Sequence, residues 1–197
     1  TDGATGARVW FDTDMTTNTE YPYGGETSVE GIPIPHPNYI GLTIPQTSDV
    51  GVVILSEPVT DLGFGALPAI GLADTLNTAP GVSAIINVVG YGRQELKPED
   101  INLKIRYQAI PMLVELDGAV TDGWNIHLTS NPGIGEGVVG VGGVCFGDSG
   151  GPALETVGSN VVLGVGSFVF NSNCRGVGYY YRVDTEYAQE FINQFMP

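Results

Sequence analysis

The sequence predicts an all-β protein, built as a sandwich or as barrels, and two observations support this prediction. Short runs of β-branched and aromatic residues recur along the chain, each bounded by Gly, Pro, Asn or Asp. Long helical patterns do not separate these runs, so antiparallel strands are favoured over a parallel sheet with crossover helices. With 197 residues the chain forms one large domain or two small ones and is long enough to bury a core.

The predicted strands follow the apolar runs in chain order. The segment NLKIRYQAI at 102–110 alternates cleanly, with Leu103, Ile105 and Tyr107 on one face, which predicts a half-buried antiparallel strand. The other clear runs are ARVWF at 7–11, DVGVVIL at 49–55, AIINVVGYG at 84–92, VVLGVGSFVF at 161–170 and VGYYYRV at 177–183.

One helix is predicted, at the end of the chain. Asp184 or Thr185 can cap it. An apolar stripe at helical spacing follows, formed by Tyr187, Phe191, Ile192 and Phe195. Residues 62–80, which contain Gly and Pro, are predicted to be a connection between two β units or one long surface loop.

Charge and composition exclude several classes of partner. The 22 acidic and 7 basic residues give a formal charge of −15, so nucleic acid and anionic membranes are poor partners, because both need a cationic face. The sequence has no apolar run long enough to span a membrane and no secretory signal pattern. Two cysteines allow a single bridge and no metal cluster, so we expect no cofactor and no metal.

The segment GGVCFGDSGGPALE at 142–155 places Ser149 among glycines and beside Asp148. Such a setting suits a serine whose hydroxyl stands clear of the backbone and attacks a substrate. Taken alone, the same segment is equally typical of an ordinary Gly-rich turn.

The motif GDSGGP resembles the nucleophile loop of the trypsin- and chymotrypsin-like serine endopeptidases, and three further segments match in the same order. They are TSDVGVVILSEPV, VLGVGSFVFNSNCRGVGYYYRV and the C-terminal helix, so the likeness runs from about His36 to the end. The resemblance implies that Ser149 is the nucleophile, that Asp49 orients the base, and that the N–H groups of Gly147 and Ser149 form the oxyanion hole. It also implies two six-stranded antiparallel β-barrels of chymotrypsin type with a C-terminal helix.

The resemblance further implies a specificity pocket. Cys145 and Cys174 would form a disulfide across it, and Ser167 would lie near Asp49. Because Gly143 stands where trypsin-type enzymes carry an acid, we expect the pocket to take an uncharged side chain. The implied substrate-binding residues are Gly143, Val144, Phe146, Ser167, Phe168, Val169 and Gly178.

The chain has two histidines, and neither is expected to be the catalytic base. His36 lies in a proline-flanked segment, and His127 follows Asp49, whereas the order in the family is His, Asp, Ser. We therefore expect that the segment carrying the base is absent and that the first barrel is N-terminally truncated. The expected units are residues 1–65 of the first barrel, a connection at 66–80, and the second barrel with its helix at 81–197.

These expectations define an endopeptidase that acts on protein or peptide substrates, secreted into an oxidising compartment. Taken alone, the chain is expected to be inactive and to pair with the missing fragment or with a second copy. Two alternatives stay open: a pseudoprotease that acts as a binding module, and an unrelated lectin-like all-β domain. The oxygen-rich segment with Asp12, Asp14, Asn18 and Glu20 lies near where some relatives bind calcium, but its spacing does not match an EF-hand, so calcium is not predicted.

Overall fold

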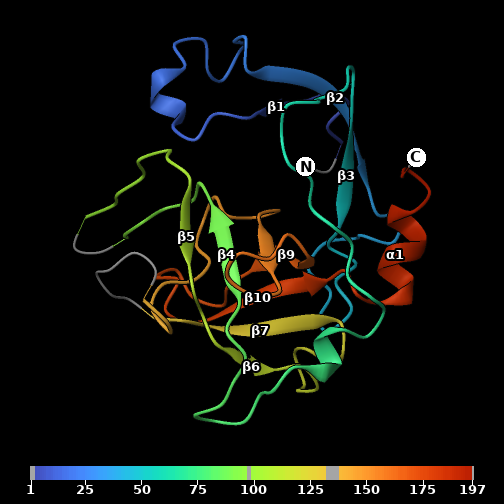
Figure 1. The fold of residues 1–197 in the computed structure, drawn as a ribbon, viewed down its shortest axis with the longest axis vertical. Helices are drawn as coiled ribbons and strands as arrows, with labels where there is room; N and C mark the ends of the chain where they lie inside the picture. The colour runs from blue at the N-terminus through green and yellow to red at the C-terminus, as the bar shows by residue number, and fades with distance from the viewer. Residues whose placement is uncertain (1–2, 97–98, 132–137, 197) are drawn as a thin grey trace.

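The computed structural model describes residues 3–96, 99–131 and 138–196, and in it the chain folds into two antiparallel sheets (Figure 1). The first sheet has the order β1-β2-β3, with β1 at Ala7–Trp10, β2 at Ser28–Pro35 and β3 at Gly51–Leu55. The second sheet has the order β5-β4-β8-β9-β10-β7-β6. Its strands are β4 (Asn87–Gly90), β5 (Tyr107–Ala109), β6 (Leu113–Glu115), β7 (Asn125–Ser130), β8 (Pro152–Leu154), β9 (Val162–Phe168) and β10 (Gly176–Arg182).

Helical structure in the described residues is short. Two 3-10 turns, η1 at Met15–Thr17 and η2 at Ala73–Thr75, precede the single α-helix, α1, at Glu186–Ile192. The side chain of Thr185 caps α1 by accepting from the N–H of Ala188. The predicted all-β class with one C-terminal helix is confirmed.

Strand β2 contains two prolines, a composition that argues against a central strand. The N–H of His36 donates to the carbonyl of Val50 at 2.8 Å, so the even-numbered residues of β2 direct their backbone groups toward β3. The odd-numbered Pro33 and Pro35 therefore face the β1 side. Because β1 pairs with β2 only as far as Gly31, no strand within the described part of the chain requires the N–H groups that these prolines lack.

The predicted strand at 102–110 is wrong over most of its length. Only Tyr107–Ala109 forms a strand, and Leu103 is exposed rather than on a buried face. Lys104 adopts a left-handed backbone (φ 57°), which interrupts an extended chain. Its carbonyl instead accepts from the N–H of Met15 at 3.0 Å, and this contact ties the loop before η1 to the second sheet.

Two clusters of buried side chains make up the core of the described residues. The second cluster joins α1 to the end of β10 and to the chain that enters β3; its buried members are Val50, Tyr181, Val183, Ala188 and Phe191. The first lies within the seven-stranded sheet and consists of Ala73, Ile86, Val88, Leu113, Leu116, Ile126, Leu128, Val144, Ala153, Leu163 and Tyr180.

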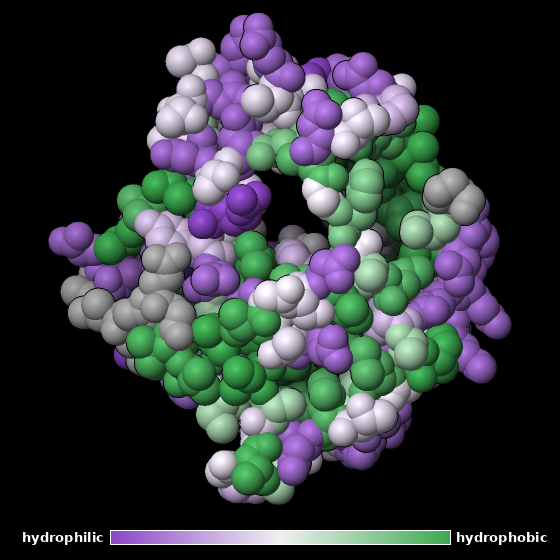
Figure 2. Space-filling view, in the orientation of Figure 1, coloured by the Kyte–Doolittle hydropathy of each residue, from purple (hydrophilic) through white to green (hydrophobic). Residues whose placement is uncertain are grey.

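The three-stranded sheet is less well covered than the seven-stranded one. Its apolar side chains are partly exposed: Ile32 by 61%, Val53 by 39% and Ile54 by 40%. By contrast, Leu163 on β9 and Tyr181 on β10 are 0% exposed. Figure 2 shows an opening between the part of the molecule that holds β1–β3 and the larger sheet. The apolar side chains of the first sheet thus lie beside unfilled space.

Candidate active site

Ser149 lies in a tight loop between the disulfide and β8. The N–H of Asp148 donates to the carbonyl of Cys145 at 3.0 Å, and the N–H of Gly151 donates to the carbonyl of Asp148 at 2.8 Å. These turns leave the Ser149 side chain exposed. The loop is then fastened to β9, because Gly150 and Gly151 exchange hydrogen bonds with Gly166, both 2.8 Å long. Ser149 is therefore held at a defined place above the sheet.

Asp49 reaches the same place from the first sheet. It is half-buried and lies two residues before β3. Its Oδ2 accepts a 2.6 Å hydrogen bond from Ser167 Oγ, and Ser167 directly follows Gly166 on β9. Since Gly166 also binds the Ser149 loop, the structure brings Asp49, Ser167 and the Ser149 loop together at the meeting point of the two sheets.

Asp148, next to the candidate nucleophile, is bound by backbone amides. Its Oδ1 accepts from Gly92 N–H at 2.7 Å and its Oδ2 accepts from Cys145 N–H at 2.8 Å. Burial raises the pKa of this carboxyl, and the two amide hydrogen bonds oppose that effect only in part. No Lys or Arg among the described residues forms an ion pair with it.

The two amides expected to form an oxyanion hole belong to Gly147 and Ser149. Gly147 has φ 100°, a conformation that favours glycine, and a Cβ there would lie 3.0 Å from the Cα of Gly92. Within the described chain neither amide donates a hydrogen bond to another residue. Both N–H groups are therefore free to bind an external acceptor, which is what stabilising an oxyanion requires.

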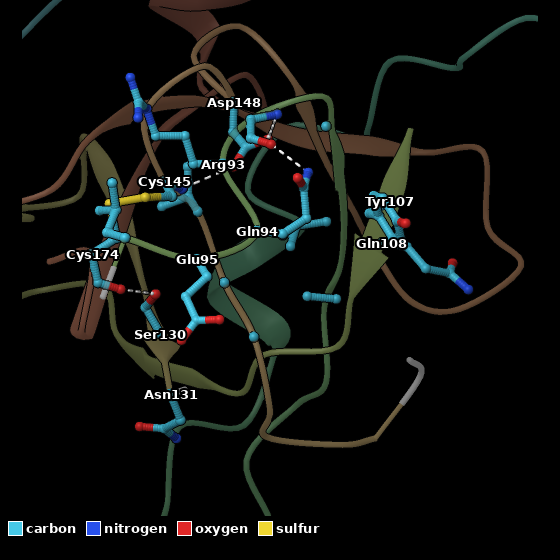
Figure 3. Close-up of a pocket in the computed structure, with 18 of the residues that line it drawn as sticks. Arg93, Gln94, Glu95, Tyr107, Gln108, Ser130, Asn131, Cys145, Asp148 and Cys174 are labelled. Atoms are coloured by element: carbon cyan, nitrogen blue, oxygen red, sulfur yellow. Dashed lines mark hydrogen bonds between the residues drawn. A yellow bond between two sulfur atoms is a disulfide. The ribbon is translucent and has the colours of Figure 1, made fainter. Parts of the chain in front are cut away.

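A cavity of about 560 Å³ lies beside this loop and is bounded by the disulfide Cys145–Cys174 (Figure 3). The bridge predicted from the resemblance is confirmed, with its two Cα atoms 5.2 Å apart. The Oγ of Ser130 donates a hydrogen bond to the carbonyl of Cys174 at 2.8 Å. A Cβ added to Gly143 would lie only 2.4 Å from this Oγ, which is too close for two non-bonded atoms. Glycine at 143 is thus required by the packing of the cavity wall.

The residues expected to bind substrate divide into two groups. Gly143 and Val144 line the cavity. Val144 also lies close to Gly178, because a Cβ added to Gly178 would be 2.2 Å from Val144 Cγ1. The remainder lie outside the lining: Phe146 is exposed, Phe168 stacks on Tyr179 at 4.6 Å, Val169 packs against the first core cluster, and Ser167 bonds Asp49.

The ring of His36 contacts two aromatic side chains. Its ring lies 4.8 Å from that of Tyr187 and 4.9 Å from that of Phe191, and its Nδ1 accepts from the N–H of Asn38 at 3.1 Å. Burial lowers its pKa, which favours the neutral imidazole. The ring of His36 is therefore packed against α1.

His127 lies on β7 with its ring stacked on Tyr179 at 4.8 Å. Its Nδ1 is 3.7 Å from Glu115 Oε2, and neither ring nitrogen has a hydrogen-bond partner among the described residues. Burial lowers its pKa more than Glu115 raises it. Among the contacts of the described residues, the His127 ring has none with Ser149 or Asp49.

Some residues of this region carry no recognisable signal in the sequence. Gly92, whose N–H binds Asp148, lies two residues after the end of β4, where the sequence gives no sign of this contact. Ser48, which precedes Asp49, has a left-handed backbone (φ 48°) that a serine does not predict.

The described ranges contain no group of three or more His, Cys, Asp or Glu that could hold a metal ion. Asp12 does bind Thr27 and Asn18, which makes this oxygen-rich segment a hydrogen-bonded loop.

Comparison with known proteins places this geometry in context. Residues 4–192 match the family model described as Trypsin. A structure of HL collagenase is similar, with 22% sequence identity, a TM-score of 0.62, and coverage of 87% of this chain and 70% of that one. A mutant of human heparin binding protein (CAP37) gives 15% identity, a TM-score of 0.64, and coverage of 96% and 75%. No curated protein matches the sequence. The predicted two-barrel fold of chymotrypsin type is confirmed by this agreement.

Proposed function

The chain belongs to the trypsin family, and we propose that it provides the nucleophile and the orienting acid of a serine endopeptidase. One observation supports this proposal most strongly: Ser167 holds Asp49 at 2.6 Å, while the adjacent Gly166 holds the loop of Ser149. A carboxylate from one sheet and an exposed serine from the other are thereby directed to one place. In this family such an arrangement serves to attack a peptide carbonyl.

The proposed reaction proceeds through an acyl-enzyme. Ser149 Oγ attacks the carbonyl carbon as its proton passes to an imidazole that Asp49 orients, and the amides of Gly147 and Ser149 receive the oxyanion. The imidazolium then returns the proton to the leaving amine, and water releases the acyl group by the same steps.

We propose that the imidazole comes from a polypeptide segment outside these 197 residues. The His36 ring packs on Tyr187 and Phe191 of α1, the His127 ring stacks on Tyr179 of β10, and the side-chain hydrogen bond of Asp49 within the described residues is with Ser167. Ser149 lines a second cavity, of about 690 Å³, together with apolar side chains such as Phe64, Leu154 and Val162. A segment that filled this cavity would lie beside Ser149.

The proposed substrates are peptides with an uncharged side chain before the cleaved bond, because position 143 carries no acid. The disulfide favours a secreted protein in an oxidising compartment, and none of the described helices is long and apolar enough to cross a membrane. Two observations favour one alternative, a pseudoprotease that binds peptides without cleaving them. Among the described residues no cation forms an ion pair with Asp148, and the rings of both histidines are packed against aromatic side chains.

Fluorophosphonate labelling of Ser149 distinguishes the two functions. The chain alone should label negligibly, and addition of a peptide that carries the family's base histidine should restore labelling and a monomeric state. Ser149→Ala should abolish the label, while His36→Ala and His127→Ala should leave it unchanged. Persistent failure to label with the added segment would favour the pseudoprotease, and labelling that requires His36 or His127 would show that the base has been misplaced.

A further inference from the structure

The segment that leads to Asp49 enters the protein interior just before this residue. Ile40, in the connection between β2 and β3, is 81% exposed, whereas Thr47 and Ser48 are 1% and 2% exposed. Both buried residues are polar, so their hydroxyl groups need partners inside the fold. The groups that bind this segment therefore determine how the chain approaches Asp49.

Asn125, the first residue of β7, binds this segment with its side-chain amide. Its Nδ2 donates to the carbonyl of Pro45 at 2.7 Å, and its Oδ1 accepts a longer hydrogen bond, of 3.5 Å, from Thr47 Oγ1. The same Nδ2 donates to the carbonyl of Val120 at 3.4 Å, in the loop before β7. Asn125 is 0% exposed and lies 80 residues after Pro45 in the chain. A buried amide of the second sheet is thus bound to the chain just before Asp49.

Asp49 is held by the second sheet at two points. Ser167 of β9 binds its carboxylate at 2.6 Å, and Asn125 of β7 binds the backbone four residues before it. Strands β9 and β7 are the two neighbours of β10 in this sheet, so the two contacts come from either side of one strand (Figure 1). Because Ser167 binds a single carboxylate oxygen, Oδ2, the direction of the other oxygen depends on the backbone that carries the side chain.

We propose that Asn125 is a positioning residue of the active site: its amide fixes residues 45–47, so that the Asp49 carboxylate meets Ser167 and is directed toward the imidazole. The proposal rests on the proposed peptidase function for its catalytic consequence and on the hydrogen bonds of the structure for its geometry. A leucine at position 125 has a similar size and removes the hydrogen bonds. The Pro45 carbonyl then loses a buried partner, and the segment has to move to reach water.

Crystal structures of the 197-residue chain and two variants test the geometry without reference to catalysis. In Asn125→Leu the Asp49 carboxylate should lie beyond hydrogen-bond distance of Ser167 Oγ, whereas in the original chain and in Asn87→Leu the bond should remain. Asn87 is the matched control because it is also the first residue of a strand in this sheet, β4, and is 6% exposed, but its Oδ1 has no hydrogen-bond partner among the described residues. An intact bond between Asp49 and Ser167 in Asn125→Leu, or an equal loss in Asn87→Leu, would overturn the proposal.

The catalytic consequence is tested in the domain supplied with the histidine-bearing segment. Asn125→Leu should lower kcat about tenfold and leave KM unchanged, because a misplaced acid slows the chemical step and Asn125 lines neither of the two cavities. Thr47→Val, which removes one of the contacts with little change in shape, should give a smaller loss of kcat and tests the same segment if Asn125→Leu does not fold. The double variant should be no worse than Asn125→Leu, and Asn87→Leu should keep the original kcat.

An Asp49→Ala background distinguishes positioning from a purely structural role. Because Asn125 acts through Asp49, Asn125→Leu should cause no further loss of kcat in this background. A further loss there, or a wild-type kcat in Asn125→Leu and Thr47→Val, would refute the role of Asn125 while leaving the peptidase function intact. A domain that stays inactive with every added segment would instead refute the proposed function, and the crystal structures would still decide the geometry of Asn125.

Discussion

Removal of the Cys145–Cys174 disulfide should destabilise the folded chain strongly. The two cysteines are separated by 29 residues, and a closed loop of this length stabilises the folded chain by about 3.6 kcal/mol at 25 °C in the chain-entropy model. The bridge also fixes the wall of the 560 Å³ cavity, because the carbonyl of Cys174 accepts the hydrogen bond from Ser130. Stability and the shape of this cavity are thus coupled.

The assay is urea unfolding at fixed pH of the oxidised chain and of the Cys145→Ala/Cys174→Ala variant. We expect the free energy of unfolding to fall by about 3–4 kcal/mol. Ser130→Ala serves as the matched control: it removes the hydrogen bond to Cys174 but keeps the bridge, and should cost about 1 kcal/mol. A loss below about 1 kcal/mol in the double variant would refute the reasoning, since the loop would then be ordered without its covalent link.

Three further predictions concern charge. Arg182→Met should lower the free energy of unfolding by about 3–5 kcal/mol, because it leaves the fully buried Asp184 without its cation. Arg182→Lys, which keeps a cation, should lower the free energy of unfolding by less. A methionine variant as stable in urea as the original chain would contradict this. The pKa of His127 is lowered in the fold, so its neutral form is favoured and stability should fall as the pH drops below the ordinary value of 6.5. His127→Phe, which keeps the stack on Tyr179, should reduce this acid loss in unfolding curves between about pH 7 and 5, and an unchanged pH profile would count against it. In the completed domain, a peptide panel that varies only the residue before the cut should favour uncharged side chains, because Gly143 offers no carboxylate; a preference for Arg or Lys would overturn that expectation.

The sequence by itself determined the class of the fold, because that information is local. Runs of β-branched and aromatic residues bounded by turn formers mark most strands, and Thr185 before an apolar stripe marks α1. The two cysteines allow one bridge, and that bridge is present. The motif around Ser149 was recognisable because its glycines are required by the backbone of the loop itself, as the φ of Gly147 shows.

Tertiary structure decided what depends on residues far apart in the chain. The alternation at 102–110 predicted a strand, but the chain turns at Lys104 to bind the loop before η1, about ninety residues earlier. Pro33 and Pro35 argue against a strand in β2, and they are tolerated only because β1 ends before it reaches them.

The candidate site shows the same division. The residue types of Ser149, Asp49 and Ser167 are visible in the sequence, but the 2.6 Å contact between Asp49 and Ser167 joins residues 118 positions apart and exists only once the two sheets meet. The complete burial of Tyr181 has no sequence signal, since the residue lies within three consecutive tyrosines. Hydrogen bonding and burial at such positions are set by neighbours from other strands, and a linear pattern of residues carries no information about those neighbours.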